Sequence, residues 1–187
     1  MNLPALDDAV LDQISRGSYP FPHDVLGVHP VGDGFVIRAL RPLANSVSAV
    51  FGDGTFVELQ HVYRGLWQGF VAAQSAPDYR ISTQYEKSSD AWVADDPYRH
   101  LPTIGEFDLH LISEGRHERL WDVLGSKVIT VSGSLGDSVG TAFAVWAPNA
   151  KAVRVVGDFN HWSGESHAMR NMGATGVWEI FIPGVGG

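Results

Sequence analysis

The chain contains an internal repeat, which constrains its fold more than any other feature of the sequence. Residues 37–50 align without a gap on residues 143–156. After a change in length, residues 65–71 match residues 176–182, including a shared Gly-x-Trp. Two copies about one small-domain length apart indicate a duplicated domain rather than a solenoid, whose repeats are shorter.

The second copy shows the strand pattern most clearly. Apolar runs of strand length cover Thr141–Ala147, Lys151–Val156 and Val177–Ile182. In the first and third of these runs, apolar residues recur at every second position, as in a strand with one buried face. The first copy adds a similar alternating run at Tyr79–Tyr85. The sequence therefore predicts an all-β fold of two tandem immunoglobulin-like β-sandwiches.

We expect three segments along the chain. They are a first sandwich with a leading helix at residues 1–106, a connector at residues 107–126 and a second sandwich at residues 127–187. The second sandwich is expected to begin with a strand at Lys127–Val131. The short N-terminal helix is predicted because apolar residues fall on one helical face, at Leu3, Leu6, Val10, Leu11 and Ile14.

The connector carries weaker signals. Asp108–Ile112 is predicted to be a short strand and Glu118–Val123 a single helical turn. Leu120, Trp121 and Leu124 are expected to anchor the interface between the two domains.

A turn interrupts the second copy at Gly157–Trp162, which has the sequence GDFNHW. Gly, Asp and Asn favour a turn, and this turn presents one large ring, that of Trp162. Two interpretations are open. The ring either anchors the loop to its own core, or it is held out at the loop tip, where a flat apolar ring can stack on the C–H face of a sugar. In the second case Asp158, Asn160 and Ser163 surround it with groups that can bond sugar hydroxyls.

These residues resemble a known family. The runs FAVWAPNAKAVRVVGDFNHW and GVWEIFIPG are similar to the carbohydrate-binding sandwich that precedes the catalytic barrel in glycogen branching enzymes. Weaker matches extend the resemblance back to about Pro22, in the segments PHDVLGVHP, DDPYR and EGRHERLWDVLG. They favour the type of branching enzyme with two N-terminal sandwiches.

The resemblance implies that the chain is the non-catalytic N-terminal part of a 1,4-α-glucan branching enzyme, which cuts an α-1,4 glucan and rejoins the piece through an α-1,6 bond. The family performs this glycosyl transfer in a (β/α)₈ barrel of about 250 residues, for which two sandwiches leave no room here. No catalytic residue is therefore assigned, and this chain alone is expected to be inactive. The implied partners are α-glucan (glycogen) and the enzyme's own catalytic barrel, without a cofactor.

The implied glucan contacts are Trp162, Asn160 and Asp158. The second sandwich is expected to be incomplete, because related modules continue into a further strand. The first copy has a Gly-rich turn at Phe51–Gly54 in place of the aromatic loop, so we expect it to support the second rather than bind sugar. The alternative is an immunoglobulin-like pair that serves protein interaction, with its aromatics in cores or interfaces and without glucan binding.

Charge and composition exclude several classes of function. The net charge is −8, and the 13 Lys and Arg residues are scattered, which argues against nucleic acid and anionic membranes as partners. There is no cysteine, so a disulfide scaffold or a thiolate zinc site is excluded. His23 and His29 lack a third ligand with usable spacing, so no metal site is predicted. Without a visible signal peptide or a membrane-length apolar run, these features favour the cytoplasm.

The most suggestive carboxylate pair is Asp95-Asp96. A glycosidase needs two carboxyl groups that face each other across a bond, whereas adjacent residues on a strand point to opposite faces. Because Pro97 follows, the pair is interpreted as a turn signal rather than a catalytic pair.

Overall fold

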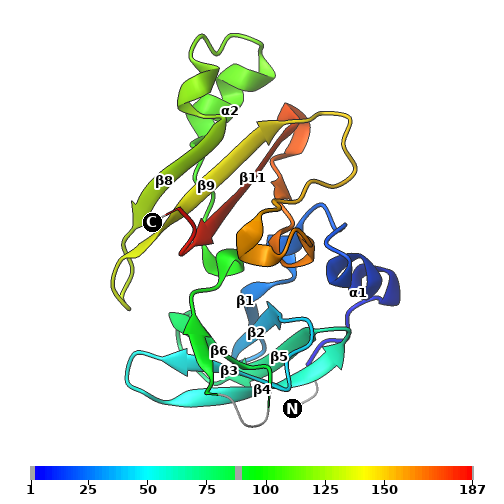
Figure 1. Cartoon of the computed structure of the whole chain (residues 1–187), viewed down its shortest axis with the longest axis vertical. Helices are drawn as coiled ribbons and strands as arrows, with labels where there is room; N and C mark the ends of the chain where they lie inside the picture. The colour runs from blue at the N-terminus through cyan, green and yellow to red at the C-terminus, as the bar shows by residue number, and fades with distance from the viewer. Residues whose placement is uncertain (1–2, 87–89, 187) are drawn as a thin grey trace.

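The structure, a computed structural model, describes residues 3–86 and 90–186. Its elements are antiparallel β-strands and two short α-helices, so the predicted all-β class is confirmed. A seven-stranded sheet lies at one end of the molecule and a four-stranded sheet at the other (Figure 1). None of the described helices is long and apolar enough to cross a membrane.

The seven-stranded sheet has the order β1-β2-β5-β4-β3-β6-β7. Its strands are β1 (Gly27–Val31), β2 (Gly34–Leu40), β3 (Ser46–Phe51), β4 (Phe56–Tyr63), β5 (Leu66–Val71), β6 (Tyr79–Gln84) and β7 (Trp92–Ala94). One half of β4 pairs with β3 and the other half with β5, so the sheet curls around its own apolar core. This core consists of Ile37, Ala39, Val47, Ala49, Leu59, Trp67, Tyr79 and Ile81.

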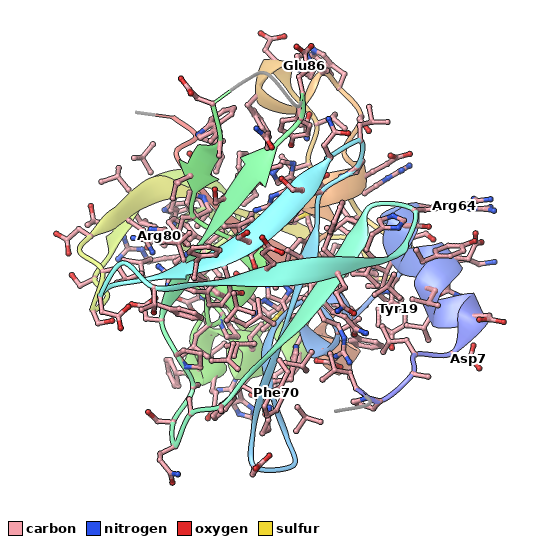
Figure 2. The ribbon with its side chains drawn as sticks, turned by 90° about the horizontal axis from the view of Figure 1, so that it is seen from below. Asp7, Tyr19, Arg64, Phe70, Arg80 and Glu86 are labelled. Carbon is pink, nitrogen blue, oxygen red and sulfur yellow. The ribbon has the colours of Figure 1, made fainter. Side chains whose placement is uncertain are left out.

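The leading helix α1 (Asp8–Ser15) is shorter than the apolar pattern predicts. The Asp7 carboxylate accepts a hydrogen bond from the Ala9 N–H at 2.8 Å, which caps the helix at this point. Leu11 and Ile14 are buried against the body of the protein. In Figure 2, Arg64 lies beside α1, where it forms an ion pair with Asp12 at 3.6 Å.

The four-stranded sheet has the order β10-β11-β9-β8. Its strands are β8 (Gly125–Val131), β9 (Ser138–Trp146), β10 (Arg170–Asn171) and β11 (Val177–Pro183). The strands predicted at 127–131, 141–147 and 177–182 are thus confirmed, each within two or three residues at its ends. Three valines of the β8–β9 hairpin are exposed, namely Val128, Val139 and Val145.

The internal repeat is present in the pairing register of both sheets. Ile37 of β2 lies opposite Gly69 of β5, and the aligned Phe143 of β9 lies opposite Ile180 of β11. Each copy also has a tryptophan whose indole N–H donates to a backbone carbonyl just after a strand with which its own strand pairs. Trp67 donates to Arg41 at 3.2 Å, and Trp178 donates to Ala147 at 3.1 Å. The two copies are therefore duplicated in structure as well as in sequence.

The shared Gly of the repeat has a steric reason. Gly65 and Gly176 have φ values of 84° and 73°, in the region that favours glycine. A Cβ atom at either position would lie 2.7 Å from an atom of the repeat's proline, Pro42 or Pro148.

The strand predicted at Lys151–Val156 is wrong. This segment makes only an isolated bridge, between Arg154 and Ala168. The aligned β3 of the first copy has strand partners on both sides, β4 and β6. Within the described part of the chain, 151–156 pairs only with residues 167–169, and such short pairing does not build a regular strand.

The strand predicted at Asp108–Ile112 is also wrong, since this segment lies in helix α2 (Glu106–Ser113). The apolar pattern at helical spacing decides this, because Leu109 and Ile112 pack together against a cluster of Ile104, Ala144 and Val177. Of the three expected interface anchors, Leu124 packs against the same cluster. Trp121 and Leu120 are instead 68% and 41% exposed.

A third cluster joins the two halves of the structure into one core; the first module is α1 with the seven-stranded sheet and the 3₁₀ helix Pro97–Arg99, and the second module is the four-stranded sheet with its loops. It combines Leu11 and Ile14 of α1 and Leu40 and Leu66 of the first sheet with Trp178, Ile180 and Ile182 of β11. In Figure 1, α1, β1 and the orange loop that precedes β11 meet between the two sheets. The modules therefore share buried apolar side chains.

Candidate functional site

The turn at 157–162 has a compact geometry. Asp158–Asn160 form a short 3₁₀ helix, and the Trp162 N–H donates to the Gly157 carbonyl at 3.0 Å. His161 and Trp162 have φ values of 51° and 59°. Left-handed backbone costs a non-glycine residue roughly 1–2 kcal/mol, so contacts around the turn must hold these two residues in place.

The ring of Trp162 projects from this turn. It is 66% exposed, and its indole N–H donates to Oδ1 of Asp158 at 2.9 Å. The hydrogen bond fixes one edge of the ring and leaves most of its surface in solvent. This position favours the stacking interpretation over that of a core anchor.

Asn160 shapes the turn from inside. Its Oδ1 accepts from the Gly157 N–H at 3.0 Å, which fixes the orientation of the amide. Its Nδ2 donates to the Val155 carbonyl at 2.8 Å and lies 3.0 Å from Nδ1 of His167. Both amide hydrogens are therefore engaged within the loop.

His167 is the acceptor that completes this network. Burial lowers the pKa of His167 to about 4, and the positive charge of Arg41 acts in the same direction. The ring is therefore neutral at pH 7, and its Nδ1 can accept the amide hydrogen of Asn160. The ring of Phe159 packs edge-on against the same imidazole, with 5.5 Å between the ring centroids.

Asp95 and Asp96 lie elsewhere, in a polar network between the modules. Asp96 is fully buried, accepts from the Tyr79 hydroxyl at 2.8 Å and caps the 3₁₀ helix that begins at Pro97. Asp95 accepts hydrogen bonds from Arg99 of the first module and from Ser138 of β9.

The two neighbouring carboxyl groups are shifted in opposite directions. Burial raises the pKa of Asp96. Burial also acts to raise the pKa of Asp95, but the contact with His100 at 3.3 Å and the hydrogen bonds from Arg99 and Ser138 outweigh it and bring the pKa well below its usual range. Although divergent pKa values can mark a catalytic pair, both groups here are engaged in structural contacts.

Arg80 reaches the same network from β6. It lies 3.5 Å from the Asp95 carboxylate and donates to the Ser138 hydroxyl at 3.4 Å; Figure 2 labels it on the curled sheet. Among residues 3–86 and 90–186, no group of three or more His, Asp or Glu side chains could hold a metal ion.

Two family models match the chain. Residues 7–98 match the N-terminal domain of alpha-1,4-glucan branching enzyme GlgB, and residues 124–187 match carbohydrate-binding module 48, the isoamylase N-terminal domain. The curated GlgB of Leifsonia xyli subsp. xyli is 56% identical over 191 residues, which cover 98% of this chain and 25% of that protein. The chain belongs to the GlgB branching-enzyme family.

Other GlgB proteins agree with this membership. The enzyme of Thermobifida fusca is 53% identical over 178 residues, covering 95% of this chain and 24% of that protein. That of Rhodococcus jostii is 51% identical over 181 residues. The chain therefore spans about a quarter of the length of the GlgB relatives it matches and corresponds to their N-terminal region. Among solved structures, the catalytic module of the glycogen-degrading pneumococcal virulence factor SpuA aligns with 46% of this chain at a TM-score of 0.33, which is too low to carry an argument.

The sequence analysis singled out Trp162, whose ring is exposed, but not the residues that support its loop. His167 contacts Asn160 in the turn, and Tyr98 contacts the backbone of Ser166 beside His167. Tyr98 lies in the first module, 68 residues before its partner Ser166. No local pattern could reveal such a contact, because it depends on how the two modules pack.

Proposed function

We propose that this chain binds α-glucan through the Trp162 loop, as the non-catalytic N-terminal part of a glycogen branching enzyme. In that enzyme it would hold or orient the polymer and pack against the catalytic barrel. The observation that carries this proposal is the exposed ring of Trp162 on a tightly bonded turn, within residues that match carbohydrate-binding module 48.

The three predicted contact residues have different parts in this proposal. Trp162 supplies the stacking surface, and the exposed Asp158 orients the ring and can accept from sugar hydroxyls. Both amide hydrogens of Asn160 are engaged in hydrogen bonds to Val155 and His167. Its direct contact with sugar is therefore limited to the remaining lone pair of its carbonyl oxygen.

The first prediction tests the ring itself. Stacking one ring on a sugar contributes on the order of 1–2 kcal/mol, at roughly 25 cal/mol per Å² of apolar area. Trp162→Ala is therefore expected to weaken glucan affinity by about five- to thirtyfold. Because one such contact is weak, the measurement should be retardation in a native gel that contains glycogen, where many sites on the polymer are available.

Trp121→Ala is the matched control, since Trp121 is equally exposed but lies in the connector. It is expected to leave retardation at the parental value. Circular dichroism must show that both variants are folded. A folded Trp162→Ala with unchanged retardation would place the glucan site elsewhere, and an unfolded one would make Trp162 a core anchor.

The alternative of an immunoglobulin-like interaction pair is not favoured. It requires the aromatic side chains to lie in cores or interfaces, whereas residues 124–187 match a carbohydrate-binding module and expose Trp162. Under that alternative, the chain would migrate equally in gels with and without glycogen.

A second prediction concerns catalysis by this chain. The neighbouring carboxyl groups Asp95 and Asp96 are engaged in the network between the modules. A (β/α)₈ barrel takes about 250 residues, whereas this chain has 187 residues and forms two antiparallel sheets. Purified chain incubated with amylose should therefore leave the absorbance of the amylose–iodine complex constant. A steady fall that persists through repurification would contradict this.

A further inference from the structure

We propose that Tyr98, a residue of the first module, positions the Trp162 loop of the second module for glucan. This inference rests on the glucan-binding function proposed above. It gives the first module, which has the Gly-rich turn Phe51–Gly54 at the position of the Trp162 turn, a specific part in binding.

The hydroxyl of Tyr98 is seated on the backbone of the second module. It donates to the Ser166 carbonyl at 3.0 Å and accepts from the Ala168 N–H at 3.0 Å. The side chain is 4% exposed. Burial raises the pKa of Tyr98, so the hydroxyl remains protonated and able to donate at neutral pH.

The segment that Tyr98 holds is bonded in turn to the base of the loop. The Val155 N–H donates to the His167 carbonyl at 3.0 Å, and the Met169 N–H donates to the Val153 carbonyl at 2.9 Å. The side chain of His167 then contacts the Asn160 amide, which also binds the backbone of Val155 and Gly157 at the start of the turn. A continuous set of hydrogen bonds therefore joins the Tyr98 hydroxyl to the turn that presents Trp162.

Other contacts from the first module brace the same segment. The Asn171 N–H donates to the Pro20 carbonyl at 2.8 Å, and the Arg154 guanidinium donates to the Arg16 carbonyl at 3.1 Å. Gly17 lies so close that a Cβ atom there would stand 2.8 Å from the carbonyl oxygen of Glu165. Tyr98 differs from these groups in contacting two residues of the segment, Ser166 and Ala168, through one buried side-chain hydroxyl.

This bracing matters because the loop is strained at its tip. His161 and Trp162 have left-handed backbone, a conformation that persists only when the surrounding structure enforces it. A loop released from Tyr98 would sample other conformations, and ordering it again on binding would weaken affinity.

The test uses the 187-residue chain labelled with 5-fluorotryptophan. Among its six tryptophans, Trp162 is assigned as the ¹⁹F resonance that disappears in Trp162→Phe. In Tyr98→Phe, the Trp162 resonance should shift or broaden more than those of the other tryptophans. Titration with maltoheptaose should show affinity reduced on the order of three- to tenfold, as expected when the hydrogen bonds of one buried hydroxyl are lost.

Tyr79→Phe is the matched control. Tyr79 is also buried, and its hydroxyl donates to Asp96, the cap of the 3₁₀ helix Pro97–Arg99, so the hydroxyl itself has no hydrogen bond to the backbone that Tyr98 holds. This variant should lose thermal stability to at least a similar extent, while the Trp162 resonance and the maltoheptaose affinity stay at parental values. General destabilisation is thereby separated from positioning of the loop.

Two results would overturn the proposal. One is a Tyr98→Phe chain in which the Trp162 resonance and the maltoheptaose affinity are unchanged, whatever its melting temperature. The other is a Tyr79→Phe chain that alters the Trp162 resonance as strongly as Tyr98→Phe does. If the parent chain shows no response to maltoheptaose, the proposed function fails, and the resonance alone then decides whether Tyr98 positions the loop.

Discussion

Glu179→Ala is expected to lower the free energy of unfolding by about 3–5 kcal/mol, because it removes one partner of a buried ion pair. Glu179 is 0% exposed. One of its oxygens accepts from the Arg170 guanidinium, and the other accepts from the backbone N–H and the hydroxyl of Thr103, at 3.1 and 2.7 Å. The variant leaves the charge of Arg170 in a buried environment without its counter-ion. Urea denaturation followed by circular dichroism measures the effect.

Two further variants make this prediction sharper. Replacing both partners, as Glu179→Met with Arg170→Met, should recover most of the loss, because the buried charge is removed together with its counter-ion. Asp12→Ala breaks ion pairs that lie at the surface, with Arg16 and Arg64, and should cost no more than about 1 kcal/mol. A Glu179→Ala chain as stable as Asp12→Ala would show that water already screens the Glu179–Arg170 pair.

Acidification is expected to destabilise the fold between about pH 6.5 and pH 4. Burial lowers the pKa of His167 from 6.5 to about 4 and that of His23 to about 3, with the positive charge of Arg170 also lowering the latter. In this range the unfolded chain therefore binds protons that the folded chain resists, and stability present above pH 6.5 is lost as the pH falls. For His167 alone the full loss is about 3 kcal/mol, at 1.36 kcal/mol per pKa unit.

The measurement is the free energy of unfolding by urea at a series of pH values. His167→Gln keeps an amide oxygen as an acceptor near Asn160 but cannot be protonated, so it should flatten the pH dependence between pH 6.5 and 4. His110→Gln is the control, since His110 is exposed on α2, and it should keep the parental slope. The carboxyl groups whose pKa is lowered, among them Asp78 with its bonds to Ser134 and Arg99, contribute mainly below pH 4. A parent chain with constant stability from pH 7 to 4.5 would contradict the prediction.

Much of the sheet structure was predictable because the signal is local. Alternating apolar residues predicted β9 and β11, and the repeat predicted a duplicated domain, which the pairing of β2 with β5 and of β9 with β11 now displays. The exposed turn at 157–162 was predictable for the same reason, since Gly, Asp and Asn specify it within six residues.

The errors arose where neighbours decide the structure. Lys151–Val156 has the composition of a strand, but the described chain gives it only a short partner at 167–169. In α2, the five-residue window at 108–112 alternates like a strand, and only the packing of Leu109 and Ile112 on one cluster reveals the helix. The support of the loop by Tyr98 was likewise invisible, because its partners lie 68 and 70 residues away.

The apolar cluster that joins α1, β2 and β5 to β11 has a consequence for how this region can be recombined. Trp178, Ile180 and Ile182 of β11 are buried together with Leu40 and Leu66 of the first sheet, so excising the second module would expose an apolar surface at the cut. The segment that matches carbohydrate-binding module 48 is therefore not expected to fold stably when it is fused to another enzyme by itself. In gene fusions the two modules should therefore be transferred together. Because the stability of each module depends on the other, the whole chain is expected to unfold in a single thermal transition.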